Sequence, residues 1–180
     1  MDEQDRRYVE LLARLLSRLR AFCRRDDGSY KKQIEKPFRA MQQLRAMGIS
    51  LAIVHGRNRL TAHEKELLRR IVLSSGPNDR VKVLELYRGR QADFKLTVCQ
   101  CQSGIGRAYT TAYSILEELA ALEILEKFSF ESTEVADAKD KCYWLPKQEF
   151  NAIITAPYVD LDHIADLGNR AVSQNIPPTI

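Results

Sequence analysis

Groups that could carry catalysis or hold a metal are few in this sequence. The four cysteines are Cys23, Cys99, Cys101 and Cys142, and the three histidines are His55, His63 and His163. Cys99 and Cys101 are two residues apart, so on a helix their thiols would point in different directions, and four ligands at structural zinc spacing do not occur. No histidine stands in a constellation suited to catalysis. We therefore expect a protein that is not an enzyme and has no metal site and no cofactor.

Gly104 and Gly106 are spaced like the first half of a dinucleotide-binding fingerprint. Tyr109 occupies the position of the third glycine, and no strand–helix–strand unit surrounds the pair. The two glycines are instead expected to lie in a tight turn between two helices.

The residues after this turn have the chemistry of nucleic-acid contacts. Arg107 begins a long helical pattern, and an arginine can bind guanine or a phosphate through two hydrogen bonds. The hydroxyl groups that follow suit phosphate or base contacts, and three basic residues lie shortly before the turn. The predicted DNA-binding residues are Arg107, Tyr109, Thr110, Thr111, Ser114, Arg88, Arg90 and Lys95.

A series of short elements is predicted to position these residues. It comprises a helix from about 78 to 87, a short helix at 98–102 capped by Thr97, a turn at 103–106, a long helix at 107–126, a strand at 124–130 and a return strand at 142–145. On the long helix the residues from Ile115 to Leu122 include a leucine ladder that should face inward, leaving Arg107 and Thr110 outward. This order of elements is that of a winged helix.

The stretch GIGRAYTTAYSILEELAALEILEKF also resembles the recognition-helix signature of winged helix-turn-helix DNA-binding domains. In that family a Gly-apolar-small-Arg turn precedes a helix that ends in Leu-x-x-Leu-x-apolar and a strand. Glu123 stands where the family often has Gly, so the junction between helix and strand is expected to differ. The resemblance covers about residues 78–146 and implies a helix that enters the major groove of DNA.

The part before this domain is predicted to be helical. An amphipathic helix is expected over 3–25, a second helix over 37–55, and a third begins at a capping box formed by Thr61 and Glu64. The predicted fold class is mainly α, with an N-terminal helical bundle at 1–76, a winged helix-turn-helix domain with a small β-hairpin at 77–146, and a helical tail at 147–180. Short helices are expected at 147–154 and 159–167 in the tail.

Residues 34–88 resemble, more weakly, the helical lid of bacterial AAA-type ATPases in which a winged helix follows the lid. The matching residues are Arg39 and Leu44 in a first element, and Gly56, Arg57, Leu60, Thr61 and Glu64 in a second. The resemblance implies an ATPase partner or core. This chain lacks the phosphate-binding loop Gly-x4-Gly-Lys-Ser/Thr, so ATP binding by this chain is not predicted.

Charge is unevenly distributed along the chain. Residues 1–60 carry 14 Lys and Arg against 7 Asp and Glu, whereas residues 131–180 carry 4 against 8. The excess of basic residues in 1–60 fits a nucleic-acid or acidic protein partner. Basic residues on solvent-exposed helix faces would give the same excess. The acidic residues that follow Arg107, at Glu117, Glu118, Glu123 and Glu126, argue for weak DNA binding by this module alone.

Two functions from different classes follow from these patterns. The first is a non-enzymatic protein that binds double-stranded DNA through a winged helix, as a transcriptional or replication-associated regulator. The alternative is a protein-interaction module within an ATPase-type complex. The leucine stripe of residues 3–25 is expected to pack on neighbouring helices. The alternative is that it packs on a second copy of the chain, which would give a homodimer. No apolar run is long enough to span a membrane and no apolar signal segment follows MDEQDRR, which predicts a cytoplasmic protein with no membrane contact.

Overall fold

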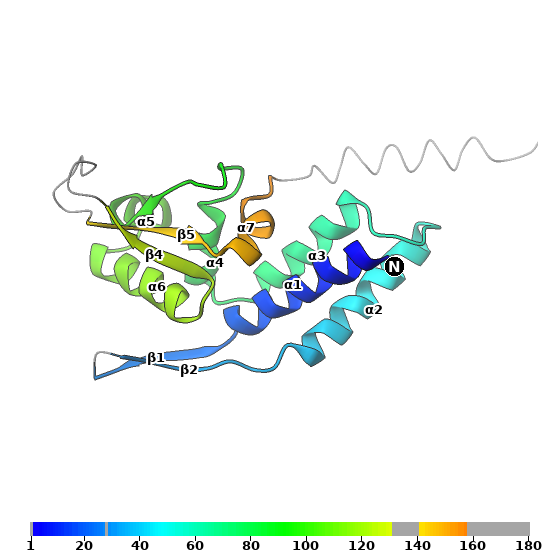
Figure 1. Ribbon diagram of the computed structural model, residues 1–180, viewed down its shortest axis with the longest axis horizontal. Coiled ribbons are helices and arrows are strands. Elements are labelled where there is room, and N and C mark those ends of the chain that lie inside the picture. The colour runs from blue at the N-terminus through cyan, green and yellow to red at the C-terminus, as the bar shows by residue number, and fades with distance from the viewer. Residues whose placement is uncertain (1, 28, 131–140, 158–180) are drawn as a thin grey trace, which may run out of the picture.

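The computed structural model describes residues 2–27, 29–130 and 141–157, which are mainly helical with a small antiparallel sheet (Figure 1). In chain order the described elements are α1 (Glu3–Leu19), β1 (Phe22–Asp26), β2 (Ser29–Gln33), α2 (Phe38–Val54), α3 (Ala62–Ser74), α4 (Asn78–Glu85), β3 (Leu96–Thr97), α5 (Val98–Ile105), α6 (Tyr109–Ala121), β4 (Leu125–Ser129), β5 (Cys142–Pro146) and α7 (Gln148–Thr155). The predicted helix at 159–167 lies outside the described residues.

The N-terminal bundle consists of α1, α2 and α3. The leucine stripe of α1 is buried within it, with Leu12, Leu15 and Leu19 fully inaccessible to solvent. Asp2 caps α1 by accepting a hydrogen bond from the backbone N–H of Asp5 at 2.8 Å. The capping box predicted at the start of α3 is confirmed. Since the stripe faces α2 and α3, packing within the chain accounts for it.

The first helix is shorter than the sequence predicted. It ends at Leu19 instead of residue 25, and the following residues form an antiparallel hairpin of β1 and β2, with Phe22 opposite Gln33 and Asp26 opposite Ser29. The apolar spacing that suggested a longer helix fails at Phe22, which is 64% exposed. The hairpin packs against α6, and such tertiary contacts commonly override local helix preference.

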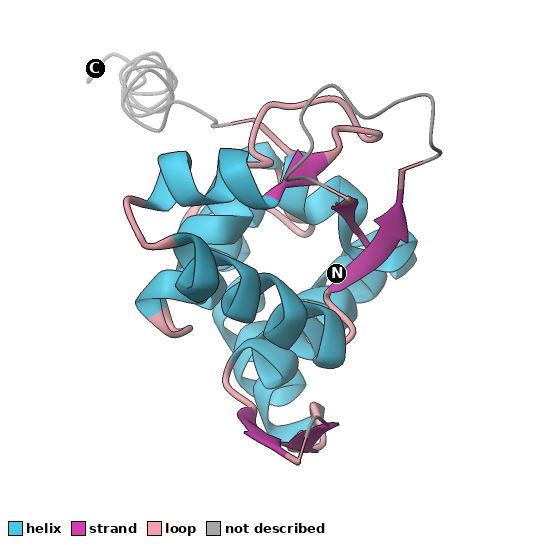
Figure 2. Cartoon of the chain, turned by 90° about the vertical axis from the view of Figure 1, so that its left-hand side faces the viewer, coloured by secondary structure: helices cyan, strands magenta, loops and turns pink. Residues whose placement is uncertain are grey.

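The second half is built around the sheet β3-β5-β4. Its central residue is Trp144, which is fully buried and pairs with Leu96 on one side and Lys127 on the other. α4, α5 and α6 pack on one another. The Tyr87 hydroxyl, just after α4, donates to the Trp144 carbonyl at 2.9 Å. Figure 2 shows the three-stranded sheet and the β1–β2 hairpin at different edges of the molecule, with helices between them.

Local backbone signals set the ends of α5 and α6. Thr97 caps α5 through a capping box with Gln100, and Gly106 ends α5 with a φ of 65°, in the left-handed region that glycine adopts without strain. The prediction of one helix over 107–126 was too long at both ends. The backbone of Ala108 is extended and Glu123 has a φ of 60°, which confines α6 to Tyr109–Ala121.

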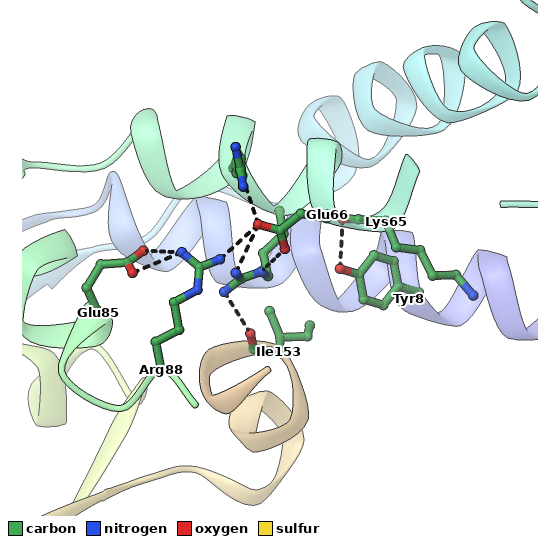
Figure 3. A network of polar contacts seen from close by, with 8 residues as sticks. Tyr8, Lys65, Glu66, Glu85, Arg88 and Ile153 are labelled. Atoms are coloured by element: carbon green, nitrogen blue, oxygen red, sulfur yellow. Dashed lines mark hydrogen bonds and ion pairs between the residues drawn. The ribbon is translucent and has the colours of Figure 1, made fainter. Parts of the chain in front are cut away.

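A buried ion-pair network joins the two halves (Figure 3). Glu66 of α3 accepts hydrogen bonds from Arg69 and from Arg88, the latter at 2.9 Å, and Arg88 also binds Glu85 at the end of α4. The Arg69 guanidinium reaches the carbonyl of Ile153 in α7 at 3.4 Å. The network therefore connects α3 with α4 and α7.

Candidate nucleic-acid interface

α6 has one buried side, and an outer side that is exposed in its first turns and contacted by the β1–β2 hairpin farther along. Its inward residues, as predicted, include Ala112, Leu116 and Leu119, all fully buried against α4 and α5. Thr110, Thr111 and Ser114, in its first two turns, are exposed. Tyr109 is half-buried and packs against the core. The start of α6 therefore presents hydroxyl groups to solvent on a helix whose opposite face is fixed.

Arg107 lies at the surface between α5 and α6. Its side chain is 48% exposed, and its guanidinium contacts the carboxylate of Asp79 in the first turn of α4, with Nη2 at 3.0 Å from Oδ1. An exposed pair of this kind contributes less than about 1 kcal/mol, so an incoming phosphate can replace the aspartate at little cost. Arg107 is thus held beside the exposed hydroxyls of α6 in a position to exchange partners.

Three of the four acidic residues in the second half of α6 and just beyond it are paired with basic side chains, and the fourth, Glu126, is exposed. Glu117 contacts Lys127 of β4 at 2.9 Å, and Glu118 contacts Arg80 of α4 at 2.5 Å. Glu123 contacts Lys32 of β2 at 2.5 Å, and this hydrogen bond from Lys32 lowers the pKa of Glu123. These carboxylates are neutralised within the chain, which removes much of the repulsion that the sequence alone suggests.

Arg88, which the sequence predicted as a DNA contact, is not exposed at this surface. Only 6% of its side chain is exposed, because the guanidinium lies in the network with Glu66 and Glu85 (Figure 3). Glu85 precedes Arg88 by three residues, a spacing at which side chains on a helical turn meet. The three-residue spacing of Glu85 and Arg88 therefore indicates in the sequence that these two side chains pair with each other.

Arg90 and Lys95 are exposed and lie in the loop between α4 and β3. The Arg90 guanidinium stacks 5.1 Å from the ring centre of Phe94, in the loop between α4 and β3. Lys95 lies 4.8 Å from the ring centre of Tyr143 in β5. Tyr143 in turn stacks on Phe128 of β4 at 5.5 Å. Lys95 therefore packs on aromatic side chains of the three-stranded sheet, whereas Arg90 lines a hollow together with Ser103 and Gly104 of α5.

The β1–β2 hairpin is the part of this region that the sequence prediction missed. Tyr30 lies beside Ser114 and Glu117 of α6, where burial raises the pKa of the phenol. The Lys32 ammonium donates to the carbonyl of Ala121 at 3.0 Å. The sequence contained one signal, an Asp-Gly turn at residues 27 and 28 between short runs with aromatic residues, which is typical of hairpins.

Other chemistry in the described part of the chain is limited. Within residues 2–27, 29–130 and 141–157, no group of three or more His, Cys, Asp or Glu side chains is placed to hold a metal ion. Burial raises the pKa of Cys101 to about 12, so this thiol stays protonated at neutral pH. Among the described helices, none combines the length and apolar character needed to cross a bilayer.

Comparison of the chain with models of protein families, with curated proteins and with solved structures gave no match.

Proposed function

We propose that residues 78–146 form a winged-helix domain and that the chain is a non-enzymatic protein that binds double-stranded DNA, with α6 entering the major groove. The order α4, β3, α5, α6, β4 and β5 and the strand order β3-β5-β4 support the proposed domain. Such a protein would act as a transcriptional or replication-associated regulator.

The observation that carries the proposal is the exposed start of α6. Thr110, Thr111 and Ser114 are accessible in its first two turns, while its inward face is held by α4 and α5. Residues early in the second helix of a helix-turn-helix contact base edges, and an α-helix of about 10–12 Å diameter fits a major groove about 12 Å wide. Arg107 would leave Asp79 and bind a phosphate or a guanine at the groove edge.

Fluorescence anisotropy with a labelled duplex, at salt concentrations from about 50 to 200 mM, tests this proposal. We expect binding by the wild type that weakens severalfold in Arg107→Ala and in Thr110→Ala/Ser114→Ala. A matched control is Arg39→Ala, because Arg39 is exposed on α2 and distant in the chain from α6. No duplex binding at low salt, or equal affinity of the wild type and every α6 variant, would count against groove recognition.

A second candidate function, a protein-interaction module, is favoured by the outer face of α2. Ile53 and Val54 are 68% and 78% exposed, and they adjoin a cavity of about 270 Å³ lined by Gly48, Ile49, Ala52, Ile53, Arg57, Asn58, Arg59 and Leu60. Residues 36–59 contain five Lys and Arg and no Asp or Glu. Charge complementarity therefore favours an acidic, amphipathic helix of a partner protein, for which the lid-like resemblance suggests an ATPase.

Calorimetric titration distinguishes this candidate. An amphipathic helical peptide of leucine and glutamate should bind the wild type but not Ile53→Asp, and its lysine counterpart should bind neither. Equal binding of both peptides, or a dimer in sedimentation that Ile53→Asp dissociates, would contradict an acidic partner helix.

A further inference from the structure

The β1–β2 hairpin lies on the outward face of α6 (Figure 1). Lys32 of β2 donates a hydrogen bond to the carbonyl of Ala121 at 3.0 Å, at the C-terminal end of the helix. Tyr30 lies about two turns closer to the helix N-terminus, beside Ser114. At about 3.6 residues per turn, Thr110, Ser114 and Ala121 fall within about 40° of one another around the helix axis. The hairpin therefore covers the continuation of the face whose exposed start is proposed to enter the major groove.

The hairpin and a DNA groove compete for this face. Thr110 and Thr111, in the first turn of α6, are exposed, whereas the outward residues from Ser114 to Ala121 lie beside the hairpin. A major groove about 12 Å wide admits one helix of about 10–12 Å diameter, so it cannot also hold two strands stacked on the outer face of that helix. With the hairpin in place, only the first turn of α6 can reach base edges, and deeper entry requires the hairpin to leave.

The hairpin is held on α6 by weak contacts. None of the ten residues in its two strands is fully buried, and seven of them are exposed. The Lys32 ammonium and the Glu123 carboxylate, which pair the hairpin with the residues just after α6, belong to side chains that are 35% and 44% exposed. A pair this exposed changes an equilibrium constant by at most about fivefold. Segments with few buried apolar contacts open at low free energy while the rest of the fold persists, so the hairpin can leave α6 without unfolding the helices.

We propose that the β1–β2 hairpin is an autoinhibitory element, which limits duplex binding while it covers α6 and permits full entry of the helix into the groove when it is released. This inference rests on the proposed entry of α6 into the groove. The apparent affinity of a ligand that binds only one conformation is reduced by the fraction of molecules in that conformation. A duplex that binds the released form more tightly must in turn shift the hairpin toward release. Contacts that hold the hairpin on α6 therefore weaken DNA binding.

Removal of the contacts that anchor the hairpin tests the proposal by anisotropy with a labelled duplex. Lys32→Gln and Tyr30→Ser each remove one contact with α6 and should each strengthen binding, by up to about fivefold for Lys32→Gln. Lys31→Gln is the matched control, because it removes the same charge from an exposed neighbour that points to the opposite face of the hairpin. This control should not strengthen binding. Wild-type or weaker binding in both anchor variants, or equal strengthening by Lys31→Gln, would overturn the proposal.

The thiol of Cys23 in β1 reports the position of the hairpin directly. Cys23 is half-buried, and burial raises its pKa, with a further contribution from Glu118 of α6. Its thiol should therefore react slowly with a maleimide while the hairpin rests on α6. A saturating duplex should accelerate the labelling of Cys23, measured by mass spectrometry of the labelled peptide, and Tyr30→Ser should accelerate it without DNA. Cys101, which is buried in the core, should remain unlabelled throughout and so controls for unfolding.

These two readouts separate autoinhibition from the groove function. If neither anchor variant accelerates the labelling of Cys23, or if the duplex slows this labelling in the wild type, the hairpin is not displaced and the proposal is overturned. If release of the hairpin leaves the affinity unchanged while Thr110→Asp weakens binding, autoinhibition is wrong and the groove function stands. If Tyr30→Ser accelerates the labelling of Cys23 but neither this variant nor the wild type binds a duplex at low salt, groove recognition by α6 is overturned, and its regulation with it.

Discussion

Replacing Glu66 by alanine should destabilise the whole described fold. The Glu66 carboxylate is 3% exposed and accepts hydrogen bonds from three guanidinium groups, those of Arg69, Arg70 and Arg88. Two of these groups, on Arg69 and Arg88, are only 2% and 6% exposed. Removing one partner of a buried ion pair leaves an uncompensated charge and typically costs about 3–5 kcal/mol. That is a large part of the total stability of about 5–15 kcal/mol that such domains have.

Urea unfolding followed by two probes measures this effect. Far-UV circular dichroism reports all helices, and Trp144, the single tryptophan, reports the buried centre of the β3-β5-β4 sheet. Because the network links α3 with α4 and α7, we expect both probes to shift to lower urea together. The control is Glu10→Ala, since the Glu10–Arg14 pair is 45% exposed on both side chains and contributes less than about 1 kcal/mol. A destabilisation in Glu66→Ala no larger than in Glu10→Ala, or a shift of one probe only, would refute this reasoning.

Three other predictions concern the pH dependence, the surface and a helix cap. Burial alone would raise the pKa of Glu64, but hydrogen bonds from Thr61 and His55 outweigh it and lower the pKa from 4.5 to about 2. The stability that this carboxylate contributes is therefore present above pH 4.5 and is lost as the pH falls toward 2. Glu64→Gln should lower the free energy of unfolding in urea by about 2–3 kcal/mol at pH 7 and by much less near pH 2. An equal loss at both pH values would contradict this reasoning. Asp79→Asn should free Arg107 and strengthen duplex binding by up to about fivefold in anisotropy, as expected for an exposed ion pair; weaker binding would argue against a role of Arg107 in DNA contact. Thr97→Ala should lower the thermal stability by about 1 kcal/mol through removal of the α5 capping box, and an unchanged melting temperature would show that the cap is unimportant.

Local signals in the sequence predicted most of the elements around the candidate site. The capping residue Thr97, the left-handed Gly106 and the inward leucines of α6 each act within a few residues, so they can be recognised without knowing the fold. The element order from α4 to β5 followed from the same kind of signal. That this order makes a winged helix which binds DNA stays a proposal.

Long-range pairing explains what the sequence did not predict. The Glu123 carboxylate is neutralised by Lys32 and Arg18, which are 91 and 105 residues away in the chain. The contact from Lys32 also holds the β1–β2 hairpin against α6. Because this contact is long-range, the leucine spacing that ends at Leu19 predicted a helix that continues wrongly into β1. Arg88 was placed at the surface because its burial depends on Glu66, a residue of another helix. In each case the partner is not a neighbour in the sequence, so the pattern of neighbouring residues does not reveal it.

Placing a negative charge on the exposed start of α6 tests groove recognition most directly. Thr110→Asp and Thr111→Asp change exposed side chains in the first turn of α6, and Gln43→Asp adds the same charge to an exposed position on α2. Anisotropy with a labelled duplex should show at least about tenfold weaker binding for each α6 variant, an effect of the size expected for one good base or phosphate contact, and wild-type affinity for Gln43→Asp. Wild-type affinity in Thr110→Asp and Thr111→Asp, with the fold intact by circular dichroism, would contradict the entry of α6 into the groove.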